Sequence, residues 1–101
     1  MKEMITSAAI KIGGKTFTGS THGRCGEQAL EPGTFTPEER ENLEWVRDAK
    51  YGFTTTANRF VTRTEAMQIA LAAHQVSDRY AGAYNLESYM LKSYATFRGQ
   101  S

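Results

Sequence analysis

The chain has 101 residues, of which 40% are hydrophobic and 23% charged, with a formal net charge of +1. This length predicts a single domain over residues 1–101, with the composition of an ordinary globular protein. The near-neutral charge argues against a general DNA or RNA binder, which would need a broad basic surface to release counterions.

The first predicted element is a β-hairpin over residues 4–19. Ile10 and Ile12 alternate with the polar Lys11, as in a strand with one buried face. Gly13-Gly14 can supply the positive φ angles of a two-residue hairpin turn. We expect the return strand to follow directly and to end near residue 19.

The secondary structure of residues 20–33 is less clearly indicated by the sequence. Ser20 or Thr21 can cap a short helix, but Gly23 and Gly26 lower its helix propensity. The sequence Glu31-Pro32-Gly33 predicts a turn.

A helix is predicted over residues 36–50. Thr36 is the expected N-cap, Pro37 occupies the first helical position, and Glu39 completes a capping box. Leu43 and Val46 would supply the apolar stripe that faces the core, with Trp45 as a further candidate.

A second hairpin, residues 51–62, leads directly into a second helix. Ala57-Asn58 is the expected turn of the hairpin. Thr62, with Glu65 three residues later, forms another capping box, and the helix should end near residues 74–75. Residues 86–94 predict a further short helix. The fold class expected is α+β, a small antiparallel sheet of hairpins packed with two or three helices.

The sequence offers no credible catalytic or metal site. His22 and Cys25 are three residues apart, but such a pair needs a third orienting group, and neighbours in a loop do not supply one. His74 is too far along the chain to complete a metal-ligand spacing. No phosphate-loop pattern occurs. We therefore expect a protein without enzymatic activity, catalytic residues, metal or cofactor.

The cysteine content and the apolar runs of the sequence indicate where the protein resides. Cys25 is the only cysteine, which rules out an intrachain disulfide and fits a reducing cytosol. The N-terminal stretch "MKEMITSAAIKIGG" lacks the long apolar run of a signal peptide, and no segment approaches the ~18–20 apolar residues of a membrane span. We expect a cytosolic protein that does not enter a membrane.

Arg59 and Arg63 form the most informative pair. Arg63 would be the first residue of the second helix, where a cation is unfavourable to the helix dipole unless an anion is also present. Arg59 is expected on the preceding strand, and the chain turns between the two, so both guanidinium groups could converge on one pyrophosphate. The alternative is that Arg63 pairs with a surface carboxylate while Arg59 is a solvated strand residue.

Two stretches resemble a set of small phage proteins. They are "AAIKIGGKTFTGSTHGRC" and "GFTTTANRFVTRTEAMQIALAAHQ", and the most specific part is the pattern R-F-V-x-R-x-E-A. The resemblance is to the Thoeris anti-defence family of the first kind and covers residues 8–30 and 52–75. The chain departs from the pattern at His74, where a glycine is usual, and in a longer tail rich in tyrosine.

This resemblance implies a function. Members act as sponges in the cytoplasm of the infected bacterial host: they bind, without cleaving, a cyclic ADP-ribose isomer that serves as an immune signal. Carried over to this chain, Arg59 and Arg63 would hold the phosphates, Asn42 would contribute a ligand-contacting amide, and Phe35 a base-stacking ring. From the sequence alone, Phe35 is as well explained as a hydrophobic staple of the following helix.

The resemblance also implies an assembly. Members form dimers with ligand pockets between subunits, and some form hexamers with additional sites for cyclic di- or trinucleotides. A homodimer or homohexamer is therefore expected. The alternative function is a non-enzymatic structural or regulatory phage protein that acts by protein–protein contact, its arginines meeting acidic side chains of a partner. A nucleotide-hydrolysing enzyme ranks third.

Overall fold

Four antiparallel strands form the central sheet in the computed structural model, which describes residues 2–92 of the chain. The strands are β1 (Ile5–Ile12), β2 (Lys15–Gly19), β3 (Lys50–Thr55) and β4 (Phe60–Thr62). Their order in the sheet is β2-β1-β3-β4, so β1 and β3 join the two hairpins side by side. The predicted α+β class, with an antiparallel sheet of hairpins, is confirmed.

Both predicted hairpin turns are present. Gly13 and Gly14 have φ angles of 59° and 77°, in the left-handed region that glycine adopts without strain. In the second hairpin, the Thr55 N–H donates to the Arg59 carbonyl across the turn at 3.2 Å. Asn58 also has a left-handed backbone, with φ of 57°, which asparagine tolerates better than most residues.

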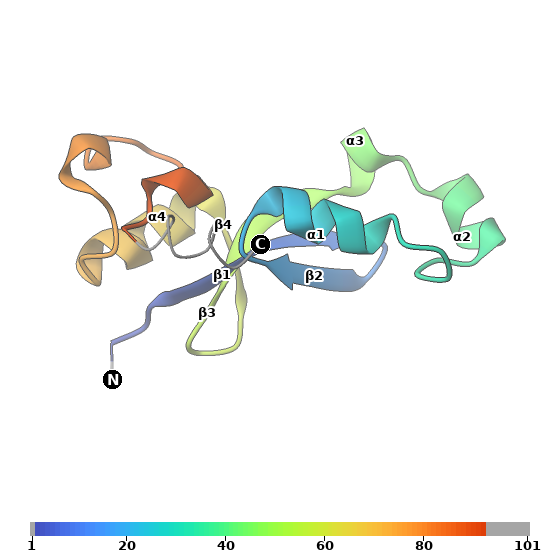
Figure 1. Cartoon of the computed structure of the whole chain (residues 1–101), viewed down its shortest axis with the longest axis horizontal. Helices are drawn as coiled ribbons and strands as arrows, with labels where there is room; N and C mark the ends of the chain where they lie inside the picture. Colours follow the sequence, from blue (N-terminus) through green and yellow to red (C-terminus); the bar gives the residue numbers. More distant parts are fainter. Residues whose placement is uncertain (1, 93–101) are drawn as a thin grey trace.

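The two longest helices are α1 (His22–Ala29) and α4 (Arg63–Ala72), and both pack against the sheet (Figure 1). Thr21 caps α1, its hydroxyl accepting from the Arg24 N–H at 3.3 Å. Thr62 caps α4 in the same way, accepting from the Glu65 N–H at 3.2 Å. The predicted end of α4 is confirmed, because His74 turns into the left-handed region with φ of 57°.

One apolar cluster joins the sheet to both helices. Its largest fully buried side chains include Ile10, Phe53 and Met67. Cys25 of α1 is also fully buried, and its Sγ lies 3.4 Å from the Ala8 carbonyl oxygen, to which it donates. Burial raises the pKa of the Cys25 thiol to about 11, so the thiol is protonated at neutral pH.

The helix predicted over residues 36–50 is wrong in one respect, because it is broken in two. The segment forms α2 (Pro37–Asn42) and α3 (Trp45–Asp48), separated by Leu43, whose backbone is extended. The predicted capping box is present, with the Glu39 N–H donating to the Thr36 hydroxyl at 3.1 Å.

The break has a packing reason. An unbroken helix would point Leu43 and Val46 in similar directions, since they are three residues apart. Instead Leu43 leaves the helix to pack against the core together with Trp45, whereas Val46 is 98% exposed. The apolar stripe predicted through Val46 is therefore not formed.

The chain after α4 folds back along that helix. It contains two short 3₁₀ helices, η1 (Asp78–Tyr80) and η2 (Ser88–Met90), of which η2 is the only helical part of the predicted segment 86–94 within the described residues. Tyr94 lies outside them. The Leu86 N–H donates to the Arg63 carbonyl at 3.0 Å, which fixes the returning segment to the start of α4.

The molecule is elongated, with extents of 45 × 26 × 25 Å. α4 and α2 lie toward opposite ends of the long axis (Figure 1). Within residues 2–92 no helix combines the length and apolar character needed to cross a membrane.

Candidate functional site

Arg59 stands at the junction between the second hairpin and α4. Its Nε and Nη2 donate to the two carboxylate oxygens of Glu3 at 2.7 and 2.9 Å, and its Nη1 donates to Glu65 at 3.0 Å. The hydroxyl of Thr55 also donates to Glu3. These hydrogen bonds, that from Arg59 first, lower the pKa of Glu3 to about 2. Arg59 thus joins the start of β1 to α4.

Arg63 is the first residue of α4, as predicted. Its Nη1 donates to Glu87 Oε1 at 2.6 Å, an ion pair that spans from α4 to the returning C-terminal segment. The pairing of Arg63 with a carboxylate, which the sequence left as an alternative, is therefore present. Arg59 is not a freely solvated side chain either. The phosphate-binding role of both arginines stays a prediction.

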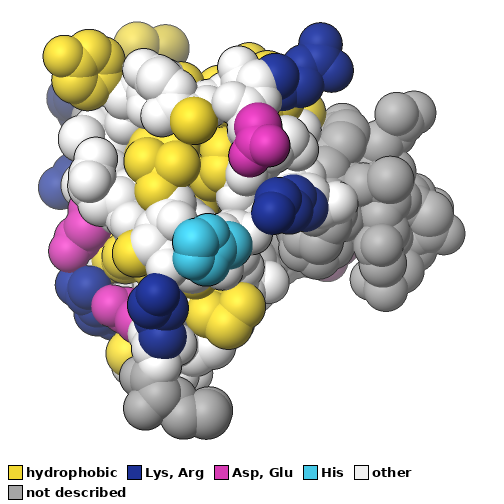
Figure 2. All heavy atoms as spheres, turned by 90° about the vertical axis from the view of Figure 1, so that its left-hand side faces the viewer, with side chains coloured by type: hydrophobic (Ala, Val, Ile, Leu, Met, Phe, Trp, Pro, Cys, Tyr) yellow, Lys and Arg dark blue, Asp and Glu magenta, His cyan; other side chains and the backbone are white. Residues whose placement is uncertain are grey.

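The charges around these arginines nearly cancel. Two guanidinium groups face three carboxylates, those of Glu3, Glu65 and Glu87, which leaves one net negative charge. Figure 2 shows this end of the molecule, where basic and acidic side chains are interspersed around a patch of hydrophobic atoms. A phosphate that reached Arg59 would have to displace a carboxylate, whereas Arg63 uses only its Nη1 in the pair with Glu87. Both arginine side chains are accessible, with 46% and 41% exposure.

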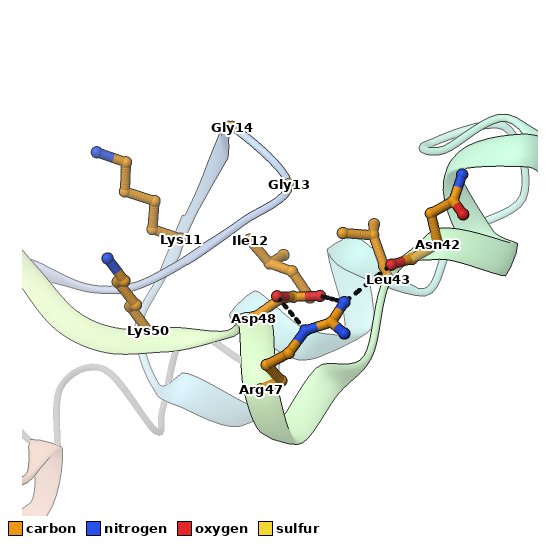
Figure 3. Close-up of a pocket in the computed structure, with 9 residues that line it drawn as sticks. All are labelled: Lys11, Ile12, Gly13, Gly14, Asn42, Leu43, Arg47, Asp48 and Lys50. Atoms are coloured by element: carbon orange, nitrogen blue, oxygen red, sulfur yellow. Dashed lines mark hydrogen bonds and ion pairs between the residues drawn. The ribbon is translucent and has the colours of Figure 1, made fainter.

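Asn42 lies at the other end of the molecule, as the last residue of α2. Its Nδ2 donates to the Glu38 carbonyl at 3.1 Å. The side chain lines a pocket of about 390 Å³ between the Gly13-Gly14 turn and α3. Ile12 and Leu43 also line this pocket, which contains charged side chains described below (Figure 3).

Phe35 immediately precedes Thr36, the N-cap of α2, and is only 8% exposed. Its ring packs edge-on against Phe17, with the centroids 6.0 Å apart, and the Lys15 ammonium lies 5.7 Å from the Phe35 ring centroid. The ring therefore belongs to the core in this structure. Stacking of Phe35 on a base stays a prediction and would require the ring or its neighbours to shift.

The four predicted ligand residues fall into two groups within one protomer. Arg59 and Arg63 lie at the β4–α4 junction, whereas Asn42 and Phe35 lie at or next to α2. Because these elements occupy opposite ends (Figure 1), a single copy of the chain does not assemble all four into one site.

His22 and Cys25 do not form a nucleophile–base pair. The Nε2 of His22 is 2.8 Å from the Gly52 carbonyl, and its ring packs against Tyr51 and Phe53. The thiol of Cys25 points instead to backbone carbonyls of β1 and Thr21. Among residues 2–92 there is also no cluster of three or more His, Cys, Asp or Glu side chains able to hold a metal ion.

Residues 4–91 match the family model described as phage T4 y16D protein. The chain belongs to the phage T4 y16D protein family. The match extends over both hairpins and all four α-helices, and it includes each of the four predicted ligand residues. Neither the curated proteins nor the solved structures with which the chain was compared give a match.

In this y16D-family protein, sequence reasoning missed two residues that the fold brings together. Lys11 of β1 lies directly opposite Lys50 of β3, and both line the Asn42 pocket. They are far apart in the chain and belong to different hairpins. Only the β1–β3 register places them side by side, and no local sequence pattern gives that register.

Proposed function

We propose that this phage protein is an anti-defence sponge that binds a cyclic ADP-ribose isomer without cleaving it and so blocks Thoeris-type immunity in the host cytoplasm. The observation that carries the proposal is the arrangement of Arg59 and Arg63 at one junction, with Arg63 at the start of the ten-residue helix α4. The R-F-V-x-R-x-E-A pattern, in a phage protein family, supports the same role.

The chemistry of this junction suits a pyrophosphate. Each guanidinium group offers a planar fork of donors, and the start of α4 adds backbone N–H groups and the positive end of the helix dipole. In the empty protein, Glu3 and Glu65 occupy the donors of Arg59, and Glu87 accepts from one nitrogen of Arg63. The phosphate oxygens would take over these hydrogen bonds, so binding is an exchange of anions in which the carboxylates return to water.

The separation of the predicted residues supports a pocket shared between subunits. In a two-fold dimer, the α2 end of one protomer can meet the α4 end of its partner, which would bring Asn42 and Phe35 next to the arginines twice. A closed pocket would also supply binding free energy that the arginines alone do not provide. Nanomolar binding requires about 12 kcal/mol, whereas two arginine contacts supply roughly 1.5–3 kcal/mol each. Base stacking and burial would contribute the rest.

The decisive measurement is a calorimetric titration of the cyclic ADP-ribose isomer into the wild type, Arg59→Ala, Arg63→Ala and Arg63→Lys. We expect each alanine variant to bind roughly 10- to 150-fold more weakly, and lysine to restore only part of the affinity. Arg24→Ala is the matched control, because Arg24 is also a half-exposed arginine paired with a carboxylate, at 3.3 Å from Glu27. Melting curves of each empty variant show that it is folded.

Two further results decide between classes of function. Unchanged affinity in both alanine variants would refute the arginine assignment. Recovery of intact ligand after heat denaturation separates a sponge from a hydrolase, which would release product. The same titration with cyclic di- and trinucleotides tests whether the protein takes a second class of ligand.

A structural or regulatory role through protein–protein contact is the second candidate. The observation that favours it is exposed apolar surface, since Leu30 is 73% exposed and Val46 98% exposed. A thermal melt distinguishes the two roles. A nucleotide present at 100 times its Kd stabilises the native protein by about 2.7 kcal/mol, whereas a protein that binds only protein partners shows no shift.

A further inference from the structure

Two lysines stand opposite one another at one end of the β1–β3 ladder. Lys11 of β1 and Lys50 of β3 are register partners, an arrangement that places like charges side by side and is destabilising for the sheet. Within residues 2–92 neither lysine forms an ion pair. The Lys11 ammonium lies 5.9 Å from the Phe60 ring centroid, an aromatic contact that supplies no negative charge. Among the described residues the pair therefore has no carboxylate partner.

Both lysines border the Asn42 pocket described above. Figure 3 shows their side chains next to each other on the side of the pocket away from Asn42, with both ammonium groups directed away from Asn42 and the Arg47–Asp48 pair in between. The volume of about 390 Å³ is within the range of sites that hold small molecules.

The pocket carries a net positive charge. Arg47 and Asp48 form a bidentate pair, with Nε–Oδ1 and Nη2–Oδ2 distances of 2.9 and 2.8 Å, so these two charges cancel. Lys11 and Lys50 then leave a net charge of +2 on the lining. Glu38 and Glu39 of α2 are not among the lining residues, although they line an adjoining hollow that shares Gly13, Asn42 and Leu43 with this pocket.

The net charge of this pocket is opposite in sign to that of the arginine junction, where three carboxylates outnumber two guanidinium groups. An anion approaching the empty protein therefore finds uncompensated positive charge at the lysines and not at the arginines. Because lysine is a compact point charge on a flexible stem, two of them can close on the oxygens of one anion.

We propose that the side of this pocket formed by Lys11 and Lys50, here named the lysine pocket, binds a diphosphate group. The two ammonium groups match the two negative charges of a diphosphate diester. The ligand class is a free diphosphate or a nucleotide that carries one. This site uses charges separate from those of the proposed arginine site, and it does not depend on the identity of the nucleotide.

The test uses inorganic pyrophosphate as the probe, titrated calorimetrically at low ionic strength into the full chain. We expect Lys11→Gln and Lys50→Gln each to weaken binding about 5-fold, and the double variant roughly 25-fold, as for exposed ion pairs. Lys50→Arg should retain most of the affinity because it keeps the charge. Lys92→Gln is the matched control: it removes the same charge from an exposed lysine outside the pocket, beside His74. Added salt should weaken binding by screening.

The titrations distinguish failure of the lysine pocket from failure of the proposed arginine site. The proposal is overturned if the wild type does not bind pyrophosphate, if the double lysine variant binds like Lys92→Gln, or if only the arginine variants lose binding. Repeating the series with the cyclic ADP-ribose isomer distinguishes the source of the diphosphate. Loss of pyrophosphate binding in the lysine variants supports the lysine pocket even where that nucleotide does not bind.

Discussion

At the scale of single residues, Arg59 has a structural task that its spacing from Arg63 does not suggest. Its guanidinium group contacts Glu3 before β1 and Glu65 in α4, so one side chain connects three parts of the chain that are distant in sequence. Any ligand role of Arg59 must therefore operate within this network. A ligand that displaces Glu3 also loosens the start of β1.

The depressed pKa of Glu3 predicts a particular pH dependence of stability. The group titrates near 2 in the folded protein, below its ordinary value of 4.5. Its contribution is thus fully present above about pH 5 and is lost as the pH falls from 4.5 toward 2. Glu3→Gln should lower the melting temperature at pH 7 and flatten its decline in acid. Thermal melts between pH 7 and 2 measure this.

Glu41→Gln is the control for this pH series, because Glu41 is exposed on α2 and has no ion pair within the described residues. It should follow the wild-type curve. The same acid slope in Glu3→Gln as in the wild type would show that the Arg59 pair contributes nothing to stability. Asp48, whose pKa is lowered to about 2 by Arg47, titrates in the same range and is left unchanged in both variants.

At the scale of elements, Gln75 connects the end of α4 to the first strand. Its side-chain amide bonds both backbone groups of Ile5, accepting from the N–H at 2.8 Å and donating to the carbonyl at 3.0 Å. The amide thus satisfies both groups much as a residue of a neighbouring strand would. The left-handed turn at His74 directs the chain so that Gln75 can reach β1.

We expect Gln75→Ala to destabilise the fold by roughly 1–3 kcal/mol, since it removes two partly buried hydrogen bonds and leaves the Ile5 groups without their partner. Gln68→Ala is the matched control, because Gln68 is exposed in the middle of α4. Urea unfolding monitored by circular dichroism measures both variants. Equal stability of the two variants would mean that water replaces the Gln75 amide at no cost.

The elements also show what local sequence patterns can predict. The caps at Thr36 and Thr62 and the turn at Gly13-Gly14 depend on neighbours within a few residues, and all three are where the sequence placed them. The break at Leu43 was not predictable in this way. It is set by packing against parts of the chain that are distant in sequence.

The candidate sites also combine features set by the local sequence with features set by contacts between distant parts of the chain. The position of Arg63 at a helix start was predictable from Thr62 and its capping pattern. Its partner Glu87, and the partner Glu3 of Arg59, come from sequence separations of 24 and 56 residues. The Lys11–Lys50 pair likewise depends on how the two hairpins align. Charge balance at a site is therefore a property of the tertiary fold.

At the scale of the whole molecule, the elongated shape leaves apolar side chains exposed near α1 and α3. Leu30 follows α1 and Val46 is part of α3, and both are mostly exposed. A pocket between subunits requires an oligomer. We predict a mass of at least twice 11.3 kDa by light scattering at micromolar concentration.

Leu30→Asp and Val46→Asp together should shift the oligomer toward monomer, because each change removes about 1.5–3 kcal/mol of apolar burial and introduces a charge. Ala81→Asp, at an exposed position after η1, is the control and should leave the mass unchanged. A monomeric wild type would contradict the shared pocket. An oligomer that survives both aspartates would place the interface on another face.

Because the Cys25 thiol is buried, its rate of chemical modification reports local opening of the fold. Cys25 is the single cysteine of the chain, and α1 must separate from β1 before an alkylating reagent can reach it. Reaction with iodoacetamide in excess therefore proceeds only through transient openings, and its rate gives the free energy of that opening when reclosing is fast. No engineered label is needed to follow how a bound nucleotide, or a second subunit, slows the exposure of this one sulfur atom.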